Sequence, residues 1–389
     1  MKFNKYLYIN NLLNSFDDNE LFKLEAWRGL LALLVVIAHA NQVFIMPITG
    51  SNTYLYWVFG AIAHFSVLGF FVISGISIAM SIALNIKRNK NIIDIKEFVI
   101  SRISRIYPPL LFSVLLCLIF KFIMIYYDLL GINESYRLKS DLDIVRDFFE
   151  FSINDVIQTL KFNNVGLVKV NGPLWSLIYE WWLYFFGVLL VNVFITKKIF
   201  YRLVSVILLI AVYNKIKHTG GSVYILIWIL GFIFYIIGEI RYKLNNFILV
   251  LSIFGLLISN YYLDFFGNKT DLSTIPIVQV LFSILFLMII FKFRINRIFN
   301  RISKFSYTLY IIHFPVFLFL LSIFHKCTNQ SISLSLILGV FGISSVMLIS
   351  YFLFGILENK KYYFNLLNSI IKKSHLILNV LLTKLNLFS

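Results

Sequence analysis

Long apolar stretches recur along almost the whole chain and limit what it can fold into. From Leu30 nearly to Glu358, runs of about 17 to 25 mostly apolar residues follow one another, the length that an α-helix needs to cross about 30 Å of hydrocarbon. Because 60% of the 389 residues are hydrophobic and only 14% are charged, water cannot be the main solvent of the chain. The sequence therefore predicts an all-α integral membrane protein.

The apolar runs predict a bundle of about ten transmembrane helices. These helices are expected at residues 30–44, 54–84, 107–127, 174–195, 203–213, 222–238, 247–263, 275–291, 306–325 and 332–357. The fifth is short, at about 11 to 15 residues, and the longest hydrophilic gap, 128–172, holds only a loop-sized structure. We expect one membrane domain over 1–389, with the bundle at 24–358 and a cytoplasmic amphipathic tail at 359–389.

The basic residues predict how the bundle is oriented. Most of the 35 Lys and Arg residues fall in segments that are cytoplasmic if the N-terminus is inside, so both termini are expected in the cytoplasm of a multi-pass protein of the cell membrane. This bias also explains the net charge of +17, and charges dispersed between spans argue against nucleic-acid binding. In the tail, residues 370–388 alternate apolar residues with lysines, which predicts an interfacial helix that contacts membrane lipids.

Two ionisable residues on the first predicted span are candidates for function. Arg28 and His39 are eleven residues apart, a spacing that puts them on one helix face with a rise of about 16 Å. Charged groups inside a bilayer are costly, so their presence suggests chemistry. The alternatives are that Arg28 is an anchor at the cytoplasmic boundary and that His39 makes an interhelical hydrogen bond.

A second pair of arginines precedes the third predicted span. Arg102 and Arg105 lie at positions i and i+3 in a predicted cytoplasmic loop, just before the Pro108-Pro109 entry to the helix. Guanidinium groups bind phosphate with two parallel hydrogen bonds and stay charged at physiological pH. The pair is therefore a candidate phosphate site, and the alternative is topological anchoring or binding of lipid head groups.

The fourth predicted span carries a carboxylate near its outer end. Ser176 and Glu180 share a helix face, and a carboxylate at this depth needs a partner: an imidazole, a sugar hydroxyl or a structural arginine. Trp175 is either a residue of the interfacial aromatic belt or a stacking surface for a carbohydrate ring.

The ninth predicted span places three polar side chains on one face. These are Ser306, Tyr310 and His313, and Pro315 nearby frees backbone carbonyls. Helix packing explains this face as well as catalysis does. The sequence contains no pattern for a phosphate-binding glycine loop, a metal cluster or a nucleophile elbow, which argues against an ATP-driven pump.

Five segments in the correct order resemble motifs of the acyltransferase 3 family. Residues 24–39, with Arg28 ten intervening residues before His39, are similar to its opening motif, and further similarities lie at 70–75, 102–108, 175–180 and 306–315. The chain departs from the family pattern at Glu25-Ala26, where an aspartate-glycine pair is frequent, and at Leu68, where a polar residue is frequent.

The resemblance implies an enzyme that transfers an acyl group, usually acetyl, from coenzyme A to a carbohydrate. The expected partners are acyl-CoA as co-substrate, with no permanently bound cofactor, and a sugar hydroxyl of an exopolysaccharide, a capsule or a lipopolysaccharide. Arg28, Arg102 and Arg105 would hold the phosphates of acetyl-CoA. His39 would act as general base or carry the acyl group, and Glu180 would steady the imidazole or the acceptor.

The remaining site residues follow from the fourth-helix and late-helix motifs. Trp175, Ser176, Tyr310 and His313 are expected to bind the substrate. Two other functions fit parts of the sequence: a proton-coupled transporter of polysaccharide or lipid-linked sugar, and a lipid-binding scaffold. No self-similarity between the halves supports the transporter, and the scaffold does not explain the spacing of Arg28 and His39. Composition indicates no oligomeric state, since lipid-facing and buried helix faces are alike.

Overall fold

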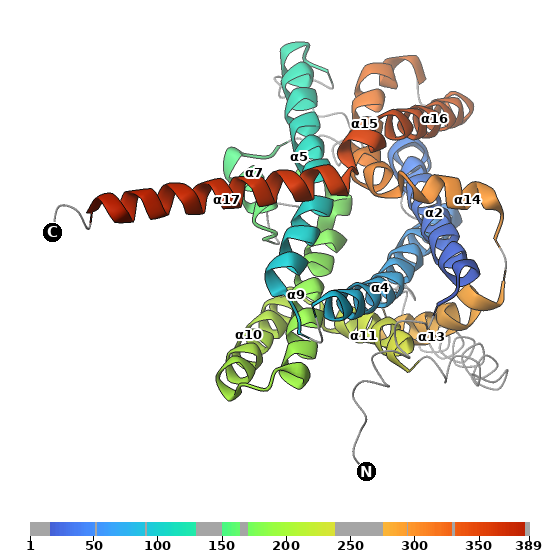
Figure 1. Ribbon diagram of the computed structural model, residues 1–389. Coiled ribbons are helices and arrows are strands. Elements are labelled where there is room, and N and C mark those ends of the chain that lie inside the picture. The colour runs from blue at the N-terminus through green and yellow to red at the C-terminus, as the bar shows by residue number, and fades with distance from the viewer. Residues whose placement is uncertain are drawn as a thin grey trace.

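The fold is a bundle of helices (Figure 1). The computed structural model describes residues 16–50, 53–89, 92–129, 150–163, 170–237, 275–293, 295–328 and 331–385, and no strand occurs in these ranges. Among the described residues, 7 helices are long and apolar enough to cross a membrane, or 8 if the bent pair α13 and α14 is one span. The all-α membrane fold predicted from the sequence is confirmed, whereas the count of ten spans and the cytoplasmic termini stay predictions.

The structure describes helices along most of the chain. In chain order they are α2 (Asp18–Ala40), the π-helix η1 (Asn41–Ile45), α3 (Met46–Thr49), α4 (Tyr54–Arg88), α5 (Ile95–Tyr126), α7 (Ile153–Leu160), the 3-10 turn η2 (Gly172–Leu174), α9 (Trp175–Ile195), α10 (Ile199–His218), α11 (Ser222–Ile236), α13 (Pro276–Lys292), α14 (Arg297–Ser303), α15 (Ser306–Thr328), α16 (Ile332–Leu357) and α17 (Lys360–Leu385).

The centre of the bundle is formed by α2, α4 and α15, whose apolar stretches are the most buried. Helix α2 packs against α4, α14 and α15, and α4 packs against α11 and α9. Helix α10 lies at the edge of the bundle beside α9, and α17 crosses α5 and then projects away from the other helices (Figure 1). All predicted helices but one coincide with helices in the described ranges, and the exception, 247–263, lies outside them.

Helix α5 begins much earlier than predicted. It starts at Ile95, after Asp94 accepts a hydrogen bond from the backbone N–H of Glu97 at 2.9 Å, and both Pro108 and Pro109 lie inside it. The helix therefore begins before the two arginines, whereas the apolar run in the sequence predicted its start at Tyr107. Prolines are tolerated inside membrane helices because neighbouring groups satisfy the freed carbonyls.

Helix α10 is also longer than the 11 to 15 residues expected from the sequence, since it extends over 20 residues from Ile199 to His218. Arg202 and Lys215 bounded the apolar run in the sequence, yet both lie within the helix. Long basic side chains can extend to the membrane surface while their stems cover apolar neighbours, so a charge near a helix end does not mark the end of the helix.

Helix α15 shows how a proline is accommodated at the core. Pro315 has no N–H to donate to the carbonyl of Ile311, four residues earlier. This carbonyl instead accepts hydrogen bonds from Ser113 Oγ at 2.9 Å and from Asn171 Nδ2 at 2.7 Å. Because these donors lie in α5 and just before η2, the proline ties three segments of the chain together.

Helices α4 and α11 approach so closely that glycine is required at their contact. A Cβ atom at Gly75 would overlap the backbone carbonyl of Trp228, and a Cβ atom at Gly231 would overlap the carbonyl of Val72. Such close approach through small residues is typical of packing between membrane helices. Gly60, in contrast, lies in the same helix as Gly75 and has open space where its side chain would be.

This contact predicts a large difference between two valine substitutions in one helix. We expect Gly75→Val to lower the free energy of unfolding by about 1–3 kcal/mol, because α4 and α11 must separate to admit the side chain. Gly60→Val is the matched control and should change the thermal unfolding midpoint in detergent only slightly. Equal loss of stability in both variants would contradict this packing.

Candidate active site

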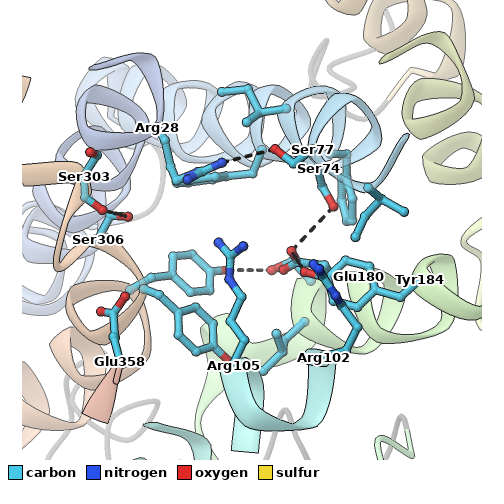
Figure 2. A pocket seen from close by; sticks show the side chains of 18 of the residues that line it. Arg28, Ser74, Ser77, Arg102, Arg105, Glu180, Tyr184, Ser303, Ser306 and Glu358 are labelled. Atoms are coloured by element: carbon cyan, nitrogen blue, oxygen red, sulfur yellow. Dashed lines mark hydrogen bonds between the residues drawn. The ribbon is translucent and has the colours of Figure 1, made fainter. Parts of the chain in front are cut away.

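A cavity of about 330 Å³ opens between the helices that carry most of the predicted site residues. Its wall is formed by α2, α4, α5, α9 and α15, together with residues just before α15 and between α16 and α17. Figure 2 shows Arg28, Ser77 and Ser74 along one wall, with Arg105, Arg102 and Glu180 facing them. The charged side chains that line the cavity are Arg28, Arg102, Arg105, Lys304, Lys360, Glu180 and Glu358. Positive charge predominates, so the cavity favours an anion.

Arg28 reaches the cavity from α2. Its guanidinium donates a hydrogen bond to Ser77 Oγ of α4 at 3.2 Å (Figure 2). The next residue, Gly29, lies so close to the backbone of Phe299 that a Cβ atom would overlap it. Helix α2 is therefore held tightly between α14 and α4, and this fixes the level at which Arg28 enters the cavity.

The two arginines of α5 differ in their surroundings. Arg102 is 5% exposed and donates a hydrogen bond to Ser81 Oγ at 2.6 Å. Its guanidinium also lies over two rings, 5.1 Å from the centroid of Phe98 and 5.5 Å from that of Tyr184. Arg102 is therefore largely held by the protein itself.

Arg105 is half-buried and points into the cavity (Figure 2). Within the described part of the chain it makes no hydrogen bond and no ion pair. Glu180 and Glu358 favour its positive charge from a distance, although neither carboxylate lies within 4.0 Å of it. Arg105 thus has all its hydrogen-bond donors available to a ligand, whereas Arg28 and Arg102 each use one of theirs on a serine.

Glu180 lies on α9 opposite Arg28. Its carboxylate accepts hydrogen bonds from Tyr184 Oη and from Ser74 Oγ, the latter at 3.5 Å. It has no ion-pair partner within 4.0 Å among the described residues. The carboxylate is therefore positioned by two hydroxyl groups, one from its own helix and one from α4.

The far end of the cavity is closed by a small hydrogen-bonded group. Tyr310 Oη of α15 lies 2.6 Å from Ser176 Oγ and 2.7 Å from the carbonyl oxygen of Pro173. Ser176 and Tyr310 both line the cavity, as the shared motif faces predicted. The tyrosine thus fixes the start of α9 relative to α15.

His39 lies beyond this closed end and does not line the cavity. Its ring is half-buried, 5.2 Å from the ring of His313 and 5.4 Å from that of Phe314. His313 in turn lies 5.9 Å from Tyr310, so a continuous series of rings joins the cavity to His39. The hydrogen-bond partner of His39 is Gln42 at 2.7 Å, and not Glu180.

His313 is fully buried. Its Nδ1 lies 3.2 Å from the carbonyl oxygen of Leu309, and its Nε2 has no hydrogen-bond partner in the described part of the chain. His313 does not line the cavity.

Trp175 also lies outside the cavity lining. Its ring is stacked at 6.5 Å on His64 and lies 5.5 Å from the ring of Tyr224. His39, His313 and Trp175 therefore form the surroundings of the closed end and not the wall of the arginine cavity.

Several polar residues of the site, among them Tyr184, Glu358 and Gln42, were not predicted from the sequence. Tyr184 follows Glu180 by four residues, a spacing that could have identified it. Glu358 accepts hydrogen bonds from Thr308 N at 2.9 Å and Thr308 Oγ1 at 2.7 Å, and so satisfies the first turn of α15. Nothing in the sequence identified Gln42 as a site residue, since a single glutamine among apolar residues is not typical of any one function.

Comparison with known proteins identifies the family of the chain. The family model Acyl_transf_3, described as an acyltransferase domain, matches residues 21–355, nearly the whole chain. No curated protein and no solved structure matched the chain. The matched region includes all the arginines of the cavity, both histidines and Glu180, and the resemblance seen in the five motifs is confirmed. The chain therefore belongs to the acyltransferase 3 family of membrane proteins.

Proposed function

We propose that this membrane acyltransferase moves an acyl group, acetyl in the simplest case, from cytoplasmic acyl-CoA to a hydroxyl group of a cell-surface carbohydrate or its precursor. The observation that carries the proposal is the guanidinium of Arg105, which makes no hydrogen bond among the described residues and lines a basic cavity. The cavity residue Tyr310 is followed by a series of ring contacts through His313 to His39. Family membership supports the transfer of an acyl group. The donor, the acceptor and the cell membrane as location are our inference.

The basic cavity suits the phosphates of coenzyme A. Arg105 offers a planar set of donors that can bind a phosphate with two hydrogen bonds, and Arg28 keeps donors beyond the one used by Ser77. Lys360 is exposed at the rim and adds positive charge. Under the orientation predicted from the basic loops, this end of the bundle faces the cytoplasm, where acyl-CoA is made.

The thioester would react at His39, which does not line the cavity, so the acyl end of the donor would have to extend past Tyr310 and His313. In the proposed step, His39 takes the proton of the acceptor hydroxyl while its oxygen bonds to the thioester carbonyl carbon. The carbon–sulfur bond then breaks, and the leaving thiolate takes the proton from the imidazole. An ester and free coenzyme A are the products, so atoms and charges balance. An imidazole suits this exchange because it binds and releases a proton near neutral pH.

The acceptor would meet the polar groups at the closed end. Ser176, Tyr310 and His313 are close to the path between cavity and His39, and Trp175 offers a ring face of the kind that stacks on sugars. Glu180, with its two hydroxyl donors, can accept a hydrogen bond from a sugar hydroxyl. These acceptor-binding roles are the ones that the motif resemblance implied for Ser176, Tyr310, His313, Trp175 and Glu180.

The function is tested by following both products in membrane vesicles from cells that make the protein. Radiolabelled acetyl-CoA should transfer label to the glycan fraction and release free thiol in equal amount. Mass spectrometry of surface glycans with and without the protein then identifies the acylated sugar. Label transport without thiol release would instead indicate a carrier and contradict the proposal.

We expect Arg105→Gln to raise the KM for acetyl-CoA about 10- to 100-fold, since about 1.5–3 kcal/mol is typical of a hydrogen bond to a charged group. The kcat should change little, because Arg105 would hold the donor far from the reacting carbon. Arg88→Gln is the matched control: Arg88 is paired with Glu97 at 3.1 Å and lies outside the cavity lining. An equal KM in the two variants would exclude Arg105 from donor binding.

We expect His39→Ala to lower kcat at least about 100-fold, as is usual when a general base is lost, while acetyl-CoA still binds. Thiol release and label transfer measure the first effect, and equilibrium binding of labelled acetyl-CoA measures the second. Undiminished transfer by this variant would remove His39 from the chemistry.

A further inference from the structure

The hydrogen bond between His39 and Gln42 determines which ring nitrogen of the histidine carries the proton. His39 Nδ1 lies 2.7 Å from Gln42 Oε1. A carboxamide oxygen can only accept a hydrogen bond, so Nδ1 must be the donor. In the neutral imidazole the lone pair is then on Nε2. Among the described residues, Nε2 of His39 has no hydrogen-bond partner.

The position of Gln42 depends on the π-helix η1, which directly follows α2. Gln42 is the second residue of η1 and lies three residues after His39. Short π-helical segments inside α-helices are rare and occur frequently at functional sites. Here the segment changes the path of the chain immediately after the histidine.

The π-helix is held in place by Phe44, which is 1% exposed. Its ring lies 5.4 Å from the ring of Phe317 in α15 and against Gly342 in α16, where an added Cβ atom would come within 3.1 Å of it. Phe44 is thus enclosed by two neighbouring helices. Because Gln42 is two residues away in the same short segment, its side chain starts from a fixed backbone.

In His313, whose ring lies 5.2 Å from that of His39, Nδ1 is also the nitrogen that makes a hydrogen bond. Its Nδ1 lies 3.2 Å from the backbone carbonyl of Leu309, which again can only accept, so its free lone pair is also on Nε2. That atom is buried and has no hydrogen-bond partner among the residues that the structure describes. Two neighbouring imidazoles therefore both have Nδ1 engaged and Nε2 available.

We propose that Gln42 is a positioning residue for acyl transfer: it fixes the imidazole of His39 in the form protonated on Nδ1, so that Nε2 is the atom that takes the proton of the acceptor hydroxyl. This inference rests on the proposed function of His39. Without Gln42 the ring can rotate and exchange protons, and only a fraction of the molecules presents a basic nitrogen in the productive orientation.

The first test measures the tautomer directly and does not depend on activity. The full-length protein, labelled with nitrogen isotope at its 6 histidines, is placed in lipid nanodiscs, and the His39 signals are assigned from their loss in His39→Ala. Wild-type protein should show His39 protonated on Nδ1. Gln42→Leu should show a mixture of tautomers, whereas Gln42→Glu, which keeps an acceptor oxygen, should retain the Nδ1–H form.

The matched control is Asn41→Leu, since Asn41 precedes Gln42 in η1 and its side chain makes no hydrogen bond to any residue in the described ranges. Its spectrum and activity should match those of the wild type. In the transfer assay, Gln42→Leu should lower kcat about 10- to 100-fold with the KM for acetyl-CoA unchanged, the usual effect of losing a group that orients a reactive histidine.

An unchanged His39 spectrum in Gln42→Leu would overturn the assignment of Gln42, even if His39 proves catalytic. The same holds if Asn41→Leu and Gln42→Leu lower kcat equally, because both would then act through the fold of η1. If wild-type protein transfers no acyl group but the tautomer depends on Gln42, the proposed function fails and the hydrogen bond is structural.

Discussion

No bulk water reaches the centre of a membrane bundle, so each polar group there must find its partner within the protein or in a ligand. Most polar groups of this structure obey that constraint. The carbonyl of Ile311, freed by Pro315, is met by two side chains, and Arg102 is met by a serine and two aromatic rings. Among the described residues, the exceptions include Arg105 and Nε of Arg102, which both line the basic cavity, and the buried Nε2 of His313, all without a hydrogen-bond partner.

The helices could be predicted from the sequence because hydrocarbon thickness imposes their length on the apolar runs. The boundaries were less predictable. For α5, a rule from soluble proteins, that proline begins a helix, placed the start at Tyr107 instead of Ile95. The two arginines, expected at the end of a loop, lie within α5 and line the cavity.

The cavity was only partly predictable. Arg28, Arg102, Arg105, Ser176, Glu180 and Tyr310 were all selected as costly or motif-bearing residues, and the structure brings them to one cavity. Periodicity places residues on a helix face but does not say which helices become neighbours. For that reason the separation of His39 from the cavity by Tyr310 and His313, and the contact with Gln42, needed the structure.

The hydrogen bonds between Glu358 and Thr308 affect how a truncated protein should be interpreted. Glu358 follows α16 directly, satisfies Thr308 in the first turn of α15, and lines the cavity, as does Lys360 at the start of α17. The segment after residue 357 looks dispensable in the sequence, where it follows the final apolar run. A shortened protein that stopped there would nevertheless lose part of the cavity wall, and inactivity of such a truncation would say nothing about the role of the distal tail.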